Sequence, residues 1–178
     1  PATATASTIV GTNCFTGQVT DSAHIITYDA TAPDDNIDDA VGAIQESDGI
    51  VTGVAMCPAM GAAIGKMKMA HSNQAMYPEF RFGGNPAAFG ALASDINNTV
   101  SFGTGTLLRA VVGDFANCFK WGYAANIPLE IIQYGDPDGQ GDLKRTNEIV
   151  LRSEAYIGWG ILDPSSFALI SEEAGDGE

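Results

Sequence analysis

The chain has 178 residues, 45% of them hydrophobic, which is enough to bury the core of one domain. Its 8 Lys and Arg against 22 Asp and Glu give a formal net charge of −14. This charge argues against sequence-independent nucleic-acid binding and against docking on anionic membranes, since both need clustered cations. We therefore expect no sequence-specific nucleic acid and no membrane among its partners.

The N-terminal residues 1–24 are rich in Thr, Ser, Ala and Gly and are predicted to be an extended lead-in. They lack the basic region and the apolar run of a signal peptide. Cys14, Cys57 and Cys118 are widely spaced and form no CxxC pair, so neither a zinc site nor a dithiol redox site is indicated. Cys57 lies in an apolar run and is interpreted as a small buried hydrophobe.

Two helices are predicted in the first half of the chain. Residues 24–28 have the β-branched and aromatic content of a short strand. A helix then begins within residues 31–35, ends at Asp48-Gly49, and buries a face with helical spacing made of Ile37, Ala40, Val41 and Ile44. Residues 51–56 are predicted to be a buried strand, and Pro58 opens the second helix. From His71 to Gly105 the chain is loop-rich and is expected to hold short strands.

The last third is predicted to be β. Strands are expected at residues 107–112, then as a pair at 119–124 and 127–134, and finally at 166–170. Between them, period-2 alternation predicts one long bent strand from Glu148 to Leu162, with Ile149, Leu151, Ile157 and Trp159 on an inward apolar face. Trp121, Trp159, Phe115 and Phe119 are interpreted as core aromatics. The tail from Ser171 to Glu178 is expected to fray.

The acidic turn at residues 135–142 resembles the start of a calcium loop. Asp136, Asp138 and Gly141 fit the EF-hand pattern, but Gln140 and Asn147 occupy its fifth and twelfth places. A solvated hairpin tip is therefore the favoured interpretation. Asp136, Asp138 and Asp142 are the metal candidates if it is wrong.

Other chemical motifs are sparse. A cluster formed by Asp34, Asp35, Asp38 and Asp39 is best explained by the helix dipole, which favours acids at a helix N-terminus. The glycine-rich run 103–106 has no following Lys and is not a P-loop. There is no GxSxG and no HExxH, so no catalytic residue and no cofactor are predicted.

The order of these elements resembles the major capsid protein of tailed bacteriophages, the Hong-Kong-97-like fold shared with encapsulins. Three stretches carry the resemblance. The first runs from the helix at residues 34–44 through the strand 52–56 and Pro58 to the helix ending at Lys66-Met67-Lys68. The second is the turn 112–115, Val-Gly-Asp-Phe. The third is the C-terminal strand 147–169, with its Pro-x-x-Phe ending.

The resemblance implies an α+β fold with a mixed or antiparallel sheet and two main helices. It assigns residues 25–146 to an axial-like domain and residues 147–170 to the long C-terminal strand of the peripheral domain. The arm, extended hairpin loop and spine helix of the family do not occur here, so the chain is expected to be a C-terminal portion or a reduced relative. The implied function is structural and non-enzymatic: a homo-oligomeric shell subunit in the virion, assembled in the host cytoplasm, with other virion proteins as further candidate partners.

Subunit contacts are expected in the loops at residues 83–108 and 135–142. The candidate interface residues are Asn85, Asn97, Asn98, Asp136, Asp138, Asp142, Glu148, Arg152 and Glu154. Two other functions stay open. One is a calcium-binding protein or small hydrolase that uses the Asp136, Asp138 and Asp142 loop or Cys57. The other is a β-rich tail or decoration module that binds a ligand.

Overall fold

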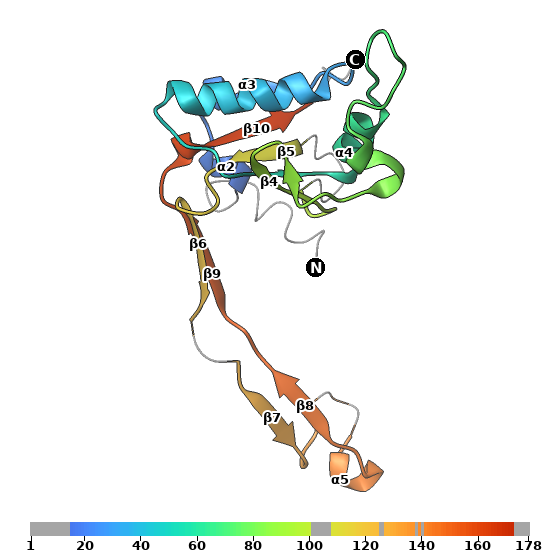
Figure 1. The fold of residues 1–178 in the computed structure, drawn as a ribbon. Coiled ribbons are helices and arrows are strands. Elements are labelled where there is room, and N and C mark those ends of the chain that lie inside the picture. The colour runs from blue at the N-terminus through green and yellow to red at the C-terminus, as the bar shows by residue number, and fades with distance from the viewer. Residues whose placement is uncertain (1–14, 101–107, 125–126, 138, 140, 173–178) are drawn as a thin grey trace, which may run out of the picture. The chain divides into compact units, whose positions relative to one another are not determined.

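The structure is a computed structural model, and it describes residues 15–100, 108–124, 127–137, 139 and 141–172 (Figure 1). The chain divides into two compact units. Unit 1 contains the described residues up to Phe119 together with those from Ile161 onward, and unit 2 is Lys120–Gly160. Among the described residues, no helix is long and apolar enough to cross a membrane.

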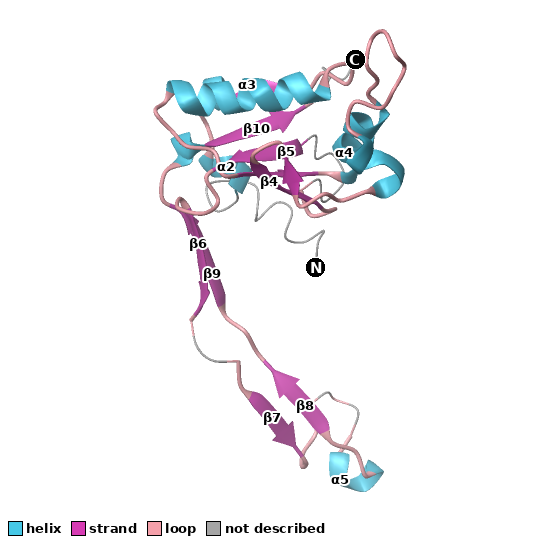
Figure 2. Ribbon diagram, in the orientation of Figure 1, coloured by secondary structure: helices cyan, strands magenta, loops and turns pink. Residues whose placement is uncertain are grey.

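Unit 1 is built on a six-stranded mixed sheet, which confirms the predicted α+β class (Figure 2). Its strands, in order across the sheet, are β1 (Ile25–Thr27), β10 (Phe167–Ser171), β5 (Leu108–Gly113), β2 (Gly53–Met56), β4 (Leu92–Ile96) and β3 (Ala88–Phe89). Two neighbouring pairs are parallel, β1 with β10 and β2 with β4, and the other three are antiparallel.

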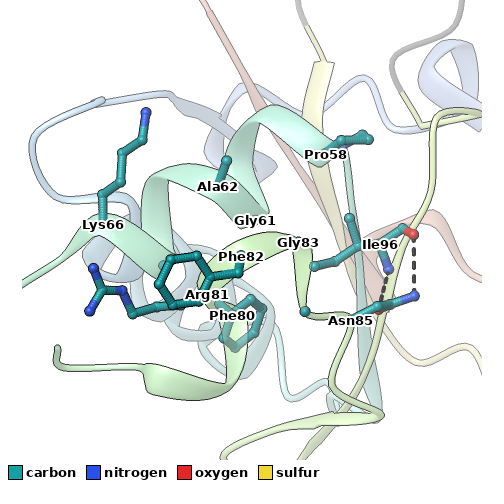
Figure 3. Close-up of a pocket in the computed structure, with 12 residues that line it drawn as sticks. Pro58, Gly61, Ala62, Lys66, Phe80, Arg81, Phe82, Gly83, Asn85 and Ile96 are labelled. Carbon is teal, nitrogen blue, oxygen red and sulfur yellow. Dashed lines mark hydrogen bonds between the residues drawn. The ribbon is translucent and has the colours of Figure 1, made fainter.

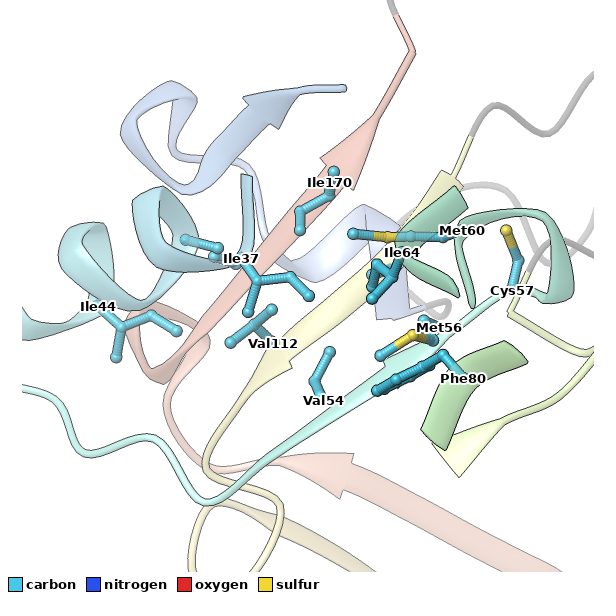
Figure 4. Close-up of a cluster of buried hydrophobic side chains, with 13 residues drawn as sticks. Ile37, Ile44, Val54, Met56, Cys57, Met60, Ile64, Phe80, Val112 and Ile170 are labelled. Carbon is cyan, nitrogen blue, oxygen red and sulfur yellow. The ribbon is translucent and has the colours of Figure 1, made fainter. Parts of the chain in front are cut away.

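The two predicted helices cover one face of this sheet. They are α3 (Pro33–Glu46) and α4 (Pro58–Lys66), each with proline in its first turn, where the missing N–H is not needed. Ile37, Ala40 and Ile44 of α3 are fully buried, as their helical spacing predicts. They pack with Met60 and Ile64 of α4 and with the facing strand residues in one core cluster (Figure 4).

The described residues cover the second face of the sheet over only part of its width. A smaller cluster there contains Val19, Leu108, Val111, Phe167 and Leu169. Short helices lie around the sheet: α2 (Phe15–Gln18), η1 (Ser22–His24), η2 (Pro78–Gly83) and η3 (Pro164–Ser166). The loop-rich segment after His71 does contain short strands, β3 and β4, together with η2.

Unit 2 consists of two two-stranded ladders and a short helix. β6 (Phe119–Tyr123) pairs with β9 (Ile157–Ile161), and β7 (Leu129–Ile132) pairs with β8 (Val150–Ser153). α5 (Leu143–Thr146) lies in the connection between β7 and β8. The predicted pairing of 119–124 with 127–134 is therefore wrong, because each of these strands pairs with the returning chain instead.

The predicted single strand from Glu148 to Leu162 is also wrong, since residues 154–156 separate β8 from β9. Its apolar residues do not point inward either. Ile149, Leu151 and Ile157 are 60–62% exposed, because the described part of unit 2 has no second layer to cover them. Trp121 and Trp159 are likewise exposed, whereas Phe115 and Phe119 are half-buried.

The compact units also divide the chain differently from the domain boundary expected after residue 146. The physical reason is that the outgoing chain, from Lys120 onward, pairs with the returning chain up to Gly160. Both segments therefore belong to one unit.

Candidate functional site

The β6–β9 ladder carries aromatic side chains on one face. Two backbone hydrogen bonds of 2.8 Å flank it, from Ala124 N–H to the Tyr156 carbonyl and from Leu162 N–H to the Cys118 carbonyl. Both bonds fit the same antiparallel register, which places Trp121 opposite Trp159. Tyr123 shares that face, since it lies two residues from Trp121, and the two rings meet edge to face at 5.6 Å.

Glycines occupy the opposite face of this ladder. They are Gly122, Gly158 and Gly160, and a Cβ added at any of them would meet nothing within 4 Å. No close contact inside the described chain requires glycine at these positions. Glycine within a strand often marks a place where another backbone approaches closely.

The β7–β8 ladder also exposes an apolar face. Ile131 lies opposite Leu151 and Leu129 opposite Ser153, so the three apolar side chains share one face. They are 56–68% exposed. On the other face, Glu130 and Arg152 occupy opposite positions on the two strands. Arg152 forms an ion pair with Glu154. Hydrogen bonding to Glu154 raises the pKa of Arg152. We call the two exposed apolar surfaces, Trp121, Tyr123, Ile157 and Trp159 on one ladder and Leu129, Ile131 and Leu151 on the other, the apolar ribbon faces.

In the acidic turn, aspartate side chains accept hydrogen bonds from nearby backbone N–H groups. A carboxylate oxygen of Asp136 accepts a hydrogen bond of 3.0 Å from Gly141 N–H, and one of Asp142 caps α5 by accepting from Lys144 N–H at 3.1 Å. Asp138 and Gln140 lie outside the described residues. Within the described part of the chain, no three metal-ligating side chains gather into a site.

The predicted interface residues of unit 1 gather at the end of β4. Asn85 and Asn97 both donate to the Asp95 carboxylate, Asn85 over 3.4 Å. Asn85 also pairs with the Ile96 backbone, accepting from its N–H at 3.0 Å. Asn98 is exposed in the turn that follows. The other described candidates belong to unit 2: Asp136, Asp142, Glu148, Arg152 and Glu154.

A pocket of about 470 Å³ lies between α4, η2 and the end of β4 (Figure 3). Lys66, Arg81 and Phe82 are among its lining residues. Phe82 is 98% exposed and has a φ of 58°, a conformation that bulky residues rarely adopt. Sequence reasoning missed this residue, because neither its identity nor its neighbours indicate a left-handed backbone.

The turn after β5 contains a buried carboxylate, Asp114. Burial opposes its ionisation, but hydrogen bonds from Asn117 and Thr52 outweigh burial and lower its pKa. The carboxylate thereby links this turn to the start of β2.

The acidic cluster at the start of α3 is partly used in packing. Asp34 accepts a hydrogen bond of 3.0 Å from the hydroxyl of Tyr77. Burial, together with this bond, raises the pKa of Tyr77 to about 12. Asp35 lies in the first turn of α3, where the helix dipole favours a negative charge.

The nucleophile candidate Cys57 is 1% exposed inside the main core cluster. A substrate could not reach it there without unfolding of the core. Its burial confirms the prediction that it is a small buried hydrophobe.

Neither a family model nor a curated protein sequence matches the chain. Solved structures do. A protein of Mycobacterium phage Ogopogo is 33% identical over 86% of this chain and 55% of its own, with a TM-score of 0.72. A protein of Gordonia phage Cozz is 26% identical over 88% of this chain and 51% of its own, with a TM-score of 0.71. The capsid of an empty GTA particle matches in fold alone, at 15% identity over 68% of this chain and 38% of its own, with a TM-score of 0.50.

This chain has the fold of phage capsid proteins. The resemblance found in the sequence is thereby confirmed at the level of fold. The chain spans about half the length of the two phage structures described above.

Proposed function

We propose that this chain is part of the major capsid subunit of a tailed bacteriophage and assembles with copies of itself into the capsomers of an icosahedral shell. The observation that carries the proposal is the match to the Mycobacterium phage Ogopogo protein, at a TM-score of 0.72 and 33% identity over 86% of this chain. The subunit is a structural component rather than an enzyme. Its location is the virion, after assembly in the host cytoplasm, where other virion proteins also bind it.

The exposed surface of unit 2 supports assembly. Isolated two-stranded ladders are marginally stable in water, and contiguous exposed apolar patches mark interaction sites. The apolar ribbon faces meet both conditions, since their large side chains lie exposed on two-stranded ladders. Contact with other parts of a shell would remove these side chains from water and stabilise unit 2.

The polar candidates are proposed to lie around these apolar contacts. Arg152 and Glu154 are exposed on and next to strand β8, which carries part of the apolar face. Charges at the rim of an interface set orientation and partner choice more than affinity. Asn85, Asn97 and Asn98 in unit 1, and Asp136, Asp142 and Glu148 in unit 2, are assigned the same task.

The test is assembly of the complete gene product, followed by sedimentation velocity and electron microscopy. We expect rings or shells. Both tryptophans of the chain lie in unit 2, so assembly should also shift their fluorescence to shorter wavelength. Ile131→Ser should weaken assembly by about tenfold or more, because it places a hydroxyl in an apolar contact.

Glu130→Ser is the matched control, because Glu130 is the neighbouring residue on the opposite face of the same strand. It should leave assembly nearly unchanged. Compact monomers as the sole product of the complete gene would contradict the proposal.

A further inference from the structure

Phe82 combines an exposed side chain with an unfavourable backbone conformation. It is 98% exposed, and its φ of 58° and ψ of 31° are left-handed. Such a conformation is unfavourable for a bulky residue and persists only where the surroundings enforce it. An exposed aromatic held in a strained conformation indicates a contact that the described part of the chain does not make.

The surroundings of Phe82 do enforce its position. Two residues earlier, Phe80 is 2% exposed and packs edge to face on Phe89 at 5.3 Å between ring centres. The Phe80 carbonyl rests against α4 at Gly65, where an added Cβ would lie 2.6 Å from its oxygen. After Phe82, Gly84 N–H bonds to the Arg81 carbonyl at 3.1 Å, which closes the turn. The backbone that carries the Phe82 ring is therefore held in place on both sides, by Phe80 and by the turn at Gly84.

The surface around Phe82 is basic, although the chain as a whole is acidic. The Arg81 guanidinium lies 5.1 Å from the centre of the Phe82 ring, and Lys66 lines the same pocket (Figure 3). We call Lys66, Arg81 and Phe82 the Phe82 patch. An aromatic ring beside two cations fits an apolar hollow that has a carboxylate at its edge.

Unit 1 offers such a hollow on the other side of β4. A groove of about 440 Å³, here the β2–β4 groove, has Gly53, Ala55, Ala93 and Asp95 on its floor and Phe115 at its side. Gly53 pairs with Ala93, and Ala55 with Asp95, so these four share the sheet face away from α3 and α4. Asp95 is exposed, and it is the single charged residue among those that line the groove.

We infer that the Phe82 ring of one copy of this chain enters the β2–β4 groove of a second copy, with Arg81 and Lys66 facing Asp95. Ile96 lines the pocket that also contains the Phe82 patch, whereas Asp95, the preceding residue of β4, lines the groove. Patch and groove therefore lie on opposite sides of the strand. Such a contact is head-to-tail, and repeated head-to-tail contacts form a ring when the rotation from one subunit to the next closes. The inference rests on the proposed function, because it assigns the contact to the self-assembling subunit.

Mixed cysteine variants test the contact directly. The full chain is prepared as Phe82→Cys and, separately, as Ala93→Cys. Both carry Cys14→Ser and Cys118→Ser, and both keep Cys57, which is buried in the core. After assembly and mild oxidation, we expect a disulfide-linked dimer from the mixture and much less from either variant alone. Assembled particles without this mixed dimer would overturn the inference and leave the proposed function intact.

Substitutions in the native background give an independent test by sedimentation. Phe82→Ala should weaken self-association by about tenfold or more, whereas Phe82→Trp, which keeps a large ring, should stay within about threefold. Arg81→Glu and Asp95→Lys should each weaken it, and the double variant should recover most of the loss. Equal association of all variants, or no recovery in the double variant, would contradict the contact. A chain that forms no oligomer at all would contradict the proposed function as well.

Discussion

Buried polar side chains connect the separate pieces of unit 1. His24 is 1% exposed, and its ring bonds to the Phe167 carbonyl at 2.9 Å and to the Ser47 hydroxyl at 3.0 Å. It thus joins the start of β1 to β10 and to the end of α3. Asp114 has the same function directly after β5, where it joins the turn to Thr52. A buried polar group that loses its partner costs more than the bond itself contributes.

Asp114 makes the free energy of unfolding depend on pH in the acidic range. Because its pKa is lowered in the folded state, the unfolded chain takes up a proton at a higher pH than the folded chain does. Its stabilising contribution is therefore complete above about pH 4, the unfolded pKa, and is lost as the pH falls through the lower folded pKa. Asp114→Asn should lower the free energy of unfolding at pH 7, as measured by urea denaturation.

The same variant should flatten the decline of stability below pH 4. Asp29→Asn is a useful comparison, because the Asp29 carboxylate is exposed and accepts its hydrogen bonds from Thr31, two residues along the chain. It should change stability at pH 7 far less. An equal loss in both variants would show that burial of Asp114 is not the cause.

Among the elements, some glycines are required because another strand lies too close for a side chain, and others have free space around them. Gly113 ends β5 between β2 and β10, and an added Cβ would lie 2.6 Å from the Ser166 carbonyl oxygen. Gly42 lies inside α3, where an added Cβ would meet nothing within 4 Å. The first glycine is required by packing, and the second weakens its helix without a steric reason in the described chain.

Alanine at these two positions should therefore have opposite effects. Gly113→Ala should lower the free energy of unfolding by about 2–3 kcal/mol, because backbone cannot move aside cheaply. Gly42→Ala should raise it by about 0.5–1 kcal/mol through helix propensity. Thermal unfolding followed by circular dichroism measures both. A stabilising Gly113→Ala would mean that β5 and β10 are less closely packed than the structure shows.

At the scale of the whole molecule, the two units differ in how they are stabilised. Both core clusters consist of residues of unit 1, whereas most large side chains of unit 2 are exposed. Among the described residues of unit 2, Leu143 in α5 is 2% exposed, and Ile132 and Val150 are half-buried. Unit 1 therefore has a core of its own, whereas most large apolar side chains in the described part of unit 2 are not buried in one.

Unit 1 should fold without unit 2. The register of the β6–β9 ladder makes Lys120 and Gly160 a hydrogen-bonded pair, which a two-residue turn requires, so Asn-Gly can replace residues 121–159. We expect this variant to unfold cooperatively, within about 8 °C of the full chain, and to lose assembly through the apolar ribbon faces. Loss of the cooperative transition would show that unit 2 contributes to the core of unit 1.

Local elements could be predicted from the sequence because local rules specify them. Proline in the first turn and apolar residues at helical spacing predicted α3 and α4, and β-branched runs predicted β1, β2, β5 and β10. The pairing in unit 2 could not be predicted, since alternation tells which side chains share a face but not which strand lies beside them. The apolar residues of β8 and β9 were expected inside for the same reason.

The candidate site residues also differ in how far the sequence could predict them. Local periodicity and composition are enough to predict the helices, most of the strands, the burial of Cys57 and a resemblance of element order to phage capsid proteins. The folded chain adds the exposure of the apolar ribbon faces, the meeting of Asn85 and Asn97 at Asp95, and the projection of Phe82 from a strained turn. Those features depend on which distant segments pack together, and the free energy of that packing is not written in any one segment.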